Sequence, residues 1–307
     1  MNKILAFSIT ILLFGIQKVS AQNYLSYYQT INNAEIAALD KNHLLSDSLY
    51  KVAFSLVNKP FKEDYYLAAL NADKLKDNTK VYNYLKLGIE NGLVFKRIKK
   101  LANFTKTKQY KNLKQDYKSL RNEYLQTLNI PLRNEIVEMI RKDQRARIFI
   151  LGSSRQMKKT DSYNKKRLLE IIHENGDKWP GFSTIGEITP KGKYDVTDNI
   201  ALMLLHFKEE GIEPLKPYML KAVMEGDMYP YQYARIIDYT SLKVFHEEYK
   251  ANGDIKKVVP CFFYGTYKNS IICNCAKAEI ERKKIGFEPI KDFYRKRNST
   301  FRCKDEK

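Results

Sequence analysis

Polar side chains interrupt two predicted apolar helix faces between Pro131 and Trp179. On the first face, Asp143 and Arg147 continue a stripe of apolar residues at helical spacing, formed by Leu132, Ile136, Met139 and Ile140. On the second face, Asp161 and Asn164 continue the stripe of Leu168, Ile171 and Ile172. Because polar groups on a core-facing stripe must find partners, we expect Asp143 and Arg147 to form a shielded ion pair.

A carboxylate, a guanidinium, an amide and an imidazole could together carry acid–base chemistry or hold a polar ligand. The candidate binding cluster comprises Asp143, Gln144, Arg147, Asp161, Asn164, Trp179 and His206. Three interpretations of it stay open: a buried network that fixes how helices meet, a ligand pocket, or a catalytic site. The sequence contains no nucleophile elbow, phosphate-binding loop or H-E-x-x-H motif, so we assign no catalytic residue and expect no cofactor and no metal.

The elements that position this cluster are predicted to be mostly α-helical, with long periodic segments and only 13 Gly and 9 Pro in 307 residues. Residues 22–130 read as a helical region, in which Lys62–Leu93 has the pattern of an αα-hairpin. Small side chains line its first half (Ala68, Ala69 and Ala72), a turn follows at Lys76–Asn78, and Val81, Leu85 and Ile89 recur in its second half. The segment resembles a single tetratricopeptide repeat.

Two further regions follow a predicted domain boundary at Asn129-Ile130-Pro131, where proline is well placed to begin a helix. Residues 131–267 are predicted to form a compact helical domain that ends in a short extended aromatic segment. Residues 268–307 are predicted to form a C-terminal helix, beginning near Ile271 and ending at Gly286, and a charged tail that is frayed from Arg295 onward.

The first 21 residues have the pattern of an export leader: a basic start at Lys3, an apolar run from Ile4 to Ile16, and the small residues Val19-Ser20-Ala21. We therefore expect an exported, periplasmic or secreted protein with no stable membrane span. Four cysteines remain (Cys261, Cys273, Cys275 and Cys303), and for these we expect one disulfide that staples the last segments rather than a metal site.

The formal net charge of +19 falls to +17 without the leader lysines Lys3 and Lys18. The densest basic run, Lys96 to Lys118, holds nine Lys/Arg against one acid and could meet an anionic envelope surface. Export argues against a nucleic-acid partner.

Several of these residues also carry a resemblance to a known family. Asp143-Gln144 with Arg147, Asp161 with Asn164, Trp179-Pro180, Leu204-Leu205-His206, Ala234 with Asp238, and Tyr264-Gly265-Thr266 resemble the DUF6624 family over about 131–267. The chain differs where that family has glutamine before the histidine (Leu205), arginine after the aspartate (Tyr239) and glutamine after Tyr-Gly-Thr (Tyr267). The resemblance implies a domain and no particular activity.

Three functions are compatible with these patterns. The leading hypothesis is an exported interaction protein that holds a protein or peptide along its N-terminal helices, in a groove beside Tyr65, Ala69 and Ala72. The alternatives are a small-molecule binding protein or a cryptic hydrolase that uses the polar cluster around Asp143, Arg147, Asn164 and His206.

Overall fold

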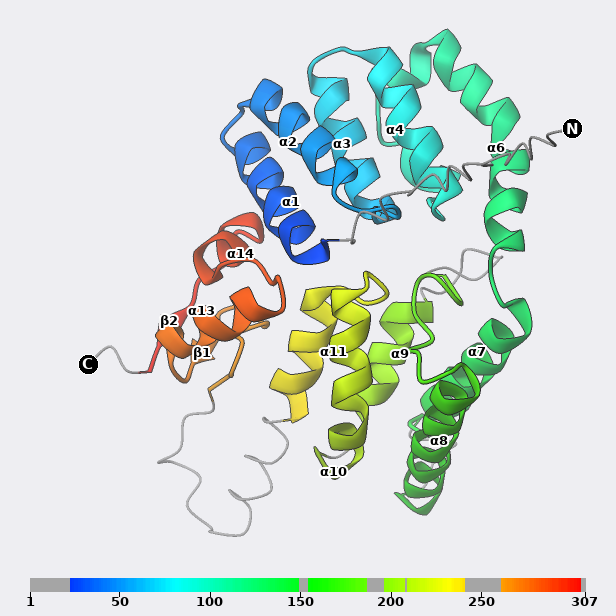
Figure 1. The fold of residues 1–307 in the computed structure, drawn as a ribbon, viewed down its shortest axis with the longest axis vertical. Helices are drawn as coiled ribbons and strands as arrows, with labels where there is room; N and C mark the ends of the chain where they lie inside the picture. Colours follow the sequence, from blue (N-terminus) through cyan, green and yellow to red (C-terminus); the bar gives the residue numbers. More distant parts are fainter. Residues whose placement is uncertain (1–22, 149–153, 187–195, 208, 241–260, 305–307) are drawn as a thin grey trace, which may run out of the picture.

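The computed structural model describes residues 23–148, 154–186, 196–207, 209–240 and 261–304, so the predicted leader lies outside the described residues (Figure 1). The described chain is mostly α-helical, as predicted. Its one sheet pairs two short parallel strands, β1 (Ile271–Ile272) and β2 (Arg302–Cys303). No described helix combines the length and apolar composition needed to cross a membrane.

Four helices form two hairpins at the start of the described chain (Figure 1). The first pairs α1 (Tyr24–Leu39) with α2 (His43–Ser55); the turn between them uses Lys41 at φ 63°, and the Asn42 side chain caps α2. The second pairs α3 (Lys62–Lys74) with α4 (Asn78–Glu90), as predicted. Ala69 and Ala72 on α3 are fully buried, as are Leu85 and Ile89 on α4. Their likeness to a tetratricopeptide repeat stays a prediction.

The basic stretch that follows is helical in three pieces: α5 (Phe95–Ile98), the 3₁₀ turn η1 (Phe104–Lys106) and α6 (Lys108–Gln126). The Asn129 side chain then accepts a hydrogen bond from the Leu132 backbone nitrogen at 3.1 Å and caps α7 (Ile130–Arg145). Pro131 lies in the first turn of α7, as predicted, because its missing N–H is not needed there. The domain boundary placed here stays a prediction.

Helix α8 (Ser154–Glu174) packs antiparallel to α7. Two ion pairs fix this register. Arg147, just past the end of α7, contacts Asp161 early in α8, and Glu135 near the start of α7 contacts Arg167 farther along α8, each at 2.5 Å. The hydrogen bonds to Glu135 and Glu174 hold the pKa of Arg167 above its usual range. Consequently, the end of α7 and the beginning of α8 lie side by side.

The next helices are α9 (Val196–Leu204), α10 (Glu209–Ile212), the 3₁₀ turn η2 (Glu213–Leu215), α11 (Lys216–Met224) and helical residues 230–240. Gly226 follows α11 with φ 77°, a conformation that favours glycine, and a Cβ there would lie 2.1 Å from the Tyr24 ring. Because glycine has no Cβ, Tyr24 of α1 can pack closely at this position. Its neighbour Tyr28 also contacts the end of α11, where Tyr28 Oη donates to the Val223 carbonyl at 2.7 Å.

The C-terminal segment corrects three predictions. Residues Ile271–Ile272 begin it as strand β1, because the Asn274 side chain caps α13 (Cys275–Lys284) and sets a later helix start. Gly286 (φ 70°) follows this helix, as predicted. Two disulfides form instead of one, Cys261–Cys273 and Cys275–Cys303. The tail from Arg295 is packed rather than frayed, since it completes α14 (Ile290–Lys296) and strand β2.

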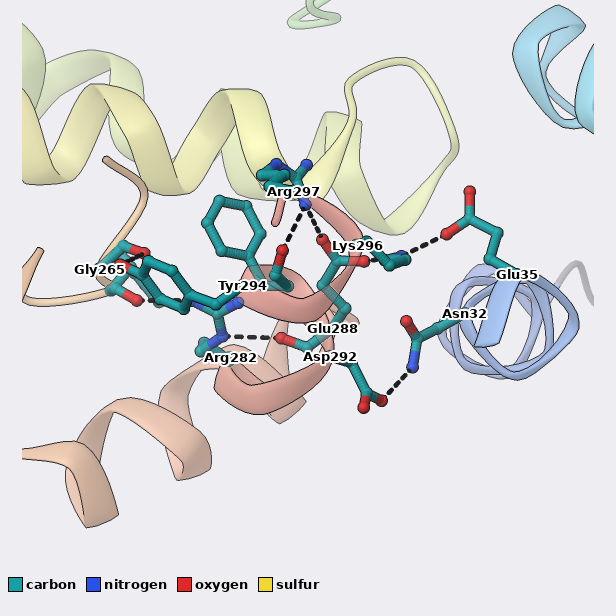
Figure 2. A network of polar contacts seen from close by, with 11 residues as sticks. Asn32, Glu35, Gly265, Arg282, Glu288, Asp292, Tyr294, Lys296 and Arg297 are labelled. Carbon is teal, nitrogen blue, oxygen red and sulfur yellow. Dashed lines mark hydrogen bonds and ion pairs between the residues drawn. The ribbon is translucent and has the colours of Figure 1, made fainter. Parts of the chain in front are cut away.

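The same segment returns to the first described helix, so that α14 lies beside α1 (Figure 1). Figure 2 shows the polar contacts that join them: Asn32 Nδ2 donates to Asp292 Oδ2 at 2.7 Å, and Lys296 pairs with Glu35. Buried apolar residues from α1 through α14 form one connected cluster. The ends of the described chain therefore close on one another.

Candidate functional site

The predicted polar cluster assembles around Asp143, whose side chain is fully buried. Arg147 Nη1 lies 2.8 Å from Asp143 Oδ1 and also donates to the Asp143 carbonyl at 2.9 Å, while Arg147 Nη2 contacts Asp161 at 2.5 Å. Gln144 Nε2 donates to Asp143 Oδ2 at 2.7 Å. The predicted ion pair is present, but only the carboxylate is sealed, since the Arg147 side chain is 19% exposed.

His206 completes this cluster from beyond the end of α9. Its Nδ1 lies 3.0 Å from Asp143 Oδ2, and its side chain is 19% exposed. An aspartate beside an imidazole resembles two of the three members of a hydrolytic triad. Among the described residues, however, no hydroxyl or thiol side chain is hydrogen-bonded to His206, and every described cysteine is in a disulfide. The arrangement therefore orients an imidazole without supplying a nucleophile.

Two predicted members stay apart from these contacts. Trp179 is buried, at 4% exposure, and packs into the apolar core without a polar contact to Asp143 or Arg147. Asn164 is fully buried, and neither its amide nitrogen nor its amide oxygen has a hydrogen-bond partner. Asn164 therefore does not join the contacts of the Asp143 carboxylate, which come from Gln144, His206 and Arg147.

Asn164 instead lines a cavity of about 470 Å³ between the end of α7 and the beginning of α8. Lys142, Arg145 and Ala146 line it from α7, and Gln156, Lys159, Thr160, Tyr163 and Asn164 line it from α8. The lining contains three basic side chains and no acidic one. Within the described residues, Lys142, Arg145 and Lys159 form no ion pair.

Of the α8 side of this cavity, only Asn164 was predicted from the sequence, although the spacing of all five residues carries a signal. Gln156, Lys159, Thr160, Tyr163 and Asn164 recur at the i, i+3, i+4, i+7 and i+8 positions that share one helix face. This polar stripe gives way to an apolar one at Leu168, just as the stripe of α7 changes from apolar to polar at Asp143. Because α7 and α8 are antiparallel, their two polar halves meet and leave the cavity between them.

Two later motifs of the proposed family resemblance, Asp238 and Tyr264-Gly265-Thr266, are hydrogen-bonded to each other. The fully buried Asp238 accepts hydrogen bonds from the Tyr264 nitrogen at 2.6 Å and from the Thr266 nitrogen and hydroxyl, each at 2.8 Å. Burial raises the pKa of Asp238 to about 6, while these hydrogen bonds act in the opposite direction. Asp238 thus anchors the segment that contains the first disulfide.

No groove is open in the described structure at the position expected on α3, beside Tyr65, Ala69 and Ala72. Tyr65, Ala69 and Ala72 are at most 6% exposed, because they pack between helices. In the described part of the chain, no group of three or more His, Cys, Asp and Glu side chains has an arrangement suited to hold a metal ion.

Comparisons with known proteins identify no relative of this chain. No protein-family model matches the chain, no curated protein matches it, and no solved structure matches it. The resemblance to the DUF6624 family accordingly stays a prediction.

Proposed function

We propose that this is an exported binding protein that takes a small organic anion in the cavity between α7 and α8. The observation that carries the proposal is Asn164, a fully buried amide whose nitrogen and oxygen both lack hydrogen-bond partners at the wall of a basic cavity. A buried polar group without a partner costs roughly 1–3 kcal/mol of folding stability. A bound ligand that supplies the partners offsets this cost.

The charge of the cavity selects the ligand class. Lys142, Arg145 and Lys159 meet at a wall that contains no carboxylate, so each would gain an ion pair from a bound oxyanion. The surrounding sequence has the same sign, with nine Lys/Arg against two acids from Arg141 to Lys166. Such a field attracts anions from solution and raises their rate of association.

The two free atoms of Asn164 refine that class further. Its nitrogen donates and its oxygen accepts, so a complementary ligand presents both an anionic oxygen and a hydroxyl group. A phosphate monoester whose organic part carries a hydroxyl group and a hydroxy acid share this chemistry. The hydroxyl of Thr160, a buried neighbour one turn before Asn164, adds a group that can donate or accept.

Two features support export and a binding role over an enzymatic one. Two disulfides close the C-terminal segment, and disulfides persist in oxidising compartments. The Asp143–His206 pair lacks a neighbouring nucleophile among the described residues. We propose that it positions the end of α7, with Asp143 lying between the cavity residues Lys142 and Arg145.

The test is calorimetric titration with glycerol 3-phosphate, glycerate and glycerol. Binding by the two acids and not by glycerol is expected, and the stronger acid identifies the preferred anionic group. Lys159→Gln should weaken binding about tenfold or more, since one charge-assisted contact contributes roughly 1.5–3 kcal/mol. Lys166→Gln is the matched control, because Lys166 is an exposed lysine of the same helix outside the cavity.

A second variant separates binding from folding. Asn164→Leu replaces the unpartnered amide with an apolar group of similar size, so it should raise the free energy of unfolding by about 1–2 kcal/mol while abolishing binding. No binding of either acid, or equal affinity in Lys159→Gln and Lys166→Gln, would overturn the proposal.

A further inference from the structure

A second cavity, of about 280 Å³, lies between α1, α3, residues 229–232 and the C-terminal segment. Its walls differ from those of the α7–α8 cavity in two ways. Aromatic rings line it from four segments, and carboxylates outnumber basic groups. The aromatic residues are Tyr28, Phe61, Tyr229, Tyr231 and Phe287, and the carboxylates are Glu35, Glu63, Asp64 and Glu288.

The two basic residues of the wall, Lys296 and Arg297, are already paired. Lys296 contacts both Glu35 and Glu288, and Arg297 Nη1 lies 2.7 Å from Glu288 (Figure 2). The Arg297 guanidinium also lies over the Phe293 ring, 3.7 Å from its centroid. Glu63 has its own partner in Arg97, on α5. Three of the four carboxylates are therefore neutralised by the protein itself.

Asp64 is the exception. Its side chain is buried, at 7% residue exposure, and among the described residues it accepts one hydrogen bond, at Oδ2 from Tyr27 Oη at 2.5 Å, and forms no ion pair. The only other oxygen, Oδ1, has no hydrogen-bond partner there. Burial disfavours the ionised form of this carboxyl group, and the described residues supply no paired cation, so ionisation of Asp64 would be stabilised by a cation from outside the chain.

Asn32 supplies a second unpartnered acceptor on the same cavity wall. The residue is 4% exposed, its nitrogen donates to Asp292, and its buried oxygen has no partner. Figure 2 shows the nitrogen turned to Asp292 and the oxygen pointing the other way. The two atoms that the cavity leaves unsatisfied, on Asn32 and Asp64, are thus both hydrogen-bond acceptors.

We propose that this cavity binds a small alkylammonium ion, whose N–H groups donate to Asp64 and Asn32 and whose alkyl group lies against the aromatic rings. An ammonium group carries donors only, which matches the Asn32 oxygen and the Asp64 carboxylate that remains once the Asp64 proton is released. Aromatic faces attract cations, and the rings here are closely set, with Phe61 and Tyr229 centroids 4.2 Å apart. The inference is independent of the anion site, because it concerns a different cavity and the opposite charge.

Proton exchange gives the binding a distinctive readout. Burial raises the pKa of Asp64 to about 8, with Glu35 and Glu63 acting in the same direction and the Tyr27 hydrogen bond and Lys296 opposing it. A bound cation favours the ionised carboxyl group, so binding at pH 7 should release a proton. The heat of binding should consequently differ between phosphate and Tris buffers, which have different ionisation enthalpies.

The experiment is a calorimetric titration of the full chain with n-butylammonium chloride and, separately, n-butanol. We expect saturable binding of n-butylammonium, at least tenfold tighter than n-butanol, with buffer-dependent heat. Asp64→Asn should weaken n-butylammonium binding at least tenfold and remove the buffer dependence. Asp73→Asn is the matched control, because Asp73 is a buried aspartate of the same helix that contacts Phe104 and does not line the cavity.

Circular dichroism checks that both variants are folded, and the comparison of n-butylammonium with n-butanol on the unaltered chain does not depend on either variant. Equal binding of the charged and neutral compounds, no binding of n-butylammonium, or full affinity in Asp64→Asn would each overturn the proposal.

Discussion

Asp143 and Asp64 are both buried carboxyl groups on helices, yet their surroundings differ in one respect. Asp143 has a guanidinium, an amide and an imidazole within hydrogen-bond distance, whereas Asp64 has a single tyrosine hydroxyl. The first is compensated by residues within the chain and the second is not. Burial alone therefore does not indicate a site. What distinguishes a structural carboxylate from a candidate binding group is whether the protein supplies its counter-charge.

Substitution of Asp143, the carboxylate with partners inside the chain, should have the largest effect on folding stability. Asp143→Ala removes the common acceptor of Arg147, Gln144 and His206, and we expect it to lower the free energy of unfolding by about 3–5 kcal/mol, the range for one partner of a buried pair. Urea denaturation of the purified variant measures this. A loss below about 0.5 kcal/mol would show that the cluster is solvated, as exposed pairs are.

Arg147→Ala should cost less, about 1–3 kcal/mol, because Gln144 and His206 remain beside the buried carboxylate. Urea denaturation of this variant beside Asp143→Ala measures the difference. A loss as large as that of Asp143→Ala would contradict a stabilising role for Gln144 and His206 at the carboxylate.

For Asp64, the expected effect is a dependence of the free energy of unfolding on pH. The folded state holds the Asp64 proton up to about pH 8, whereas the unfolded chain releases it near pH 4, so folding stability should fall as pH rises between these values. Asp64→Asn removes this titration and should flatten the decline by up to about 1.4 kcal/mol per pH unit. Parallel slopes for the variant and the unaltered chain would show that Asp64 is ionised throughout.

An exposed ion pair should have the smallest effect on folding stability and serves as the reference for the two buried carboxyl groups. Lys166 and Glu170 form an exposed pair on α8, with 82% and 43% of their side chains accessible and a separation of 3.7 Å. Lys166→Ala should change the free energy of unfolding by at most about 0.5 kcal/mol, and 0.5 M salt should remove most of that change. A larger loss would mean that surface charges stabilise this basic chain more than isolated pairs do.

Local sequence patterns predicted the elements better than the sites. Helical spacing and caps were sufficient for the α3–α4 hairpin, for the start of α7 at Pro131 and for the pairing of Asp143 with Arg147, since these depend on residues one or two turns apart. The spacing of the α8 stripe was readable too, but its meaning depended on the antiparallel partner helix.

The rest depends on contacts between distant segments. Tyr27 and Asp64 are 37 residues apart, and Glu35 and Lys296 are 261 residues apart, so no periodicity links them. The pairing of four cysteines was open for the same reason, because the order of residues does not state which sulfurs meet. The packed tail was missed because its charges looked solvated, whereas Lys296 has two carboxylate partners on other segments.

The contact between α1 and α14 has a consequence for how the chain acquires its structure during synthesis. The ribosome produces α1 long before α14, so Asn32 and Glu35 are without their partners until about 260 residues later. Contacts between such distant segments are slow to form because a long loop must close first. The α1 face that contacts α14 therefore stays uncovered until the C-terminal segment has been made, so this contact can stabilise the fold only after synthesis of α14.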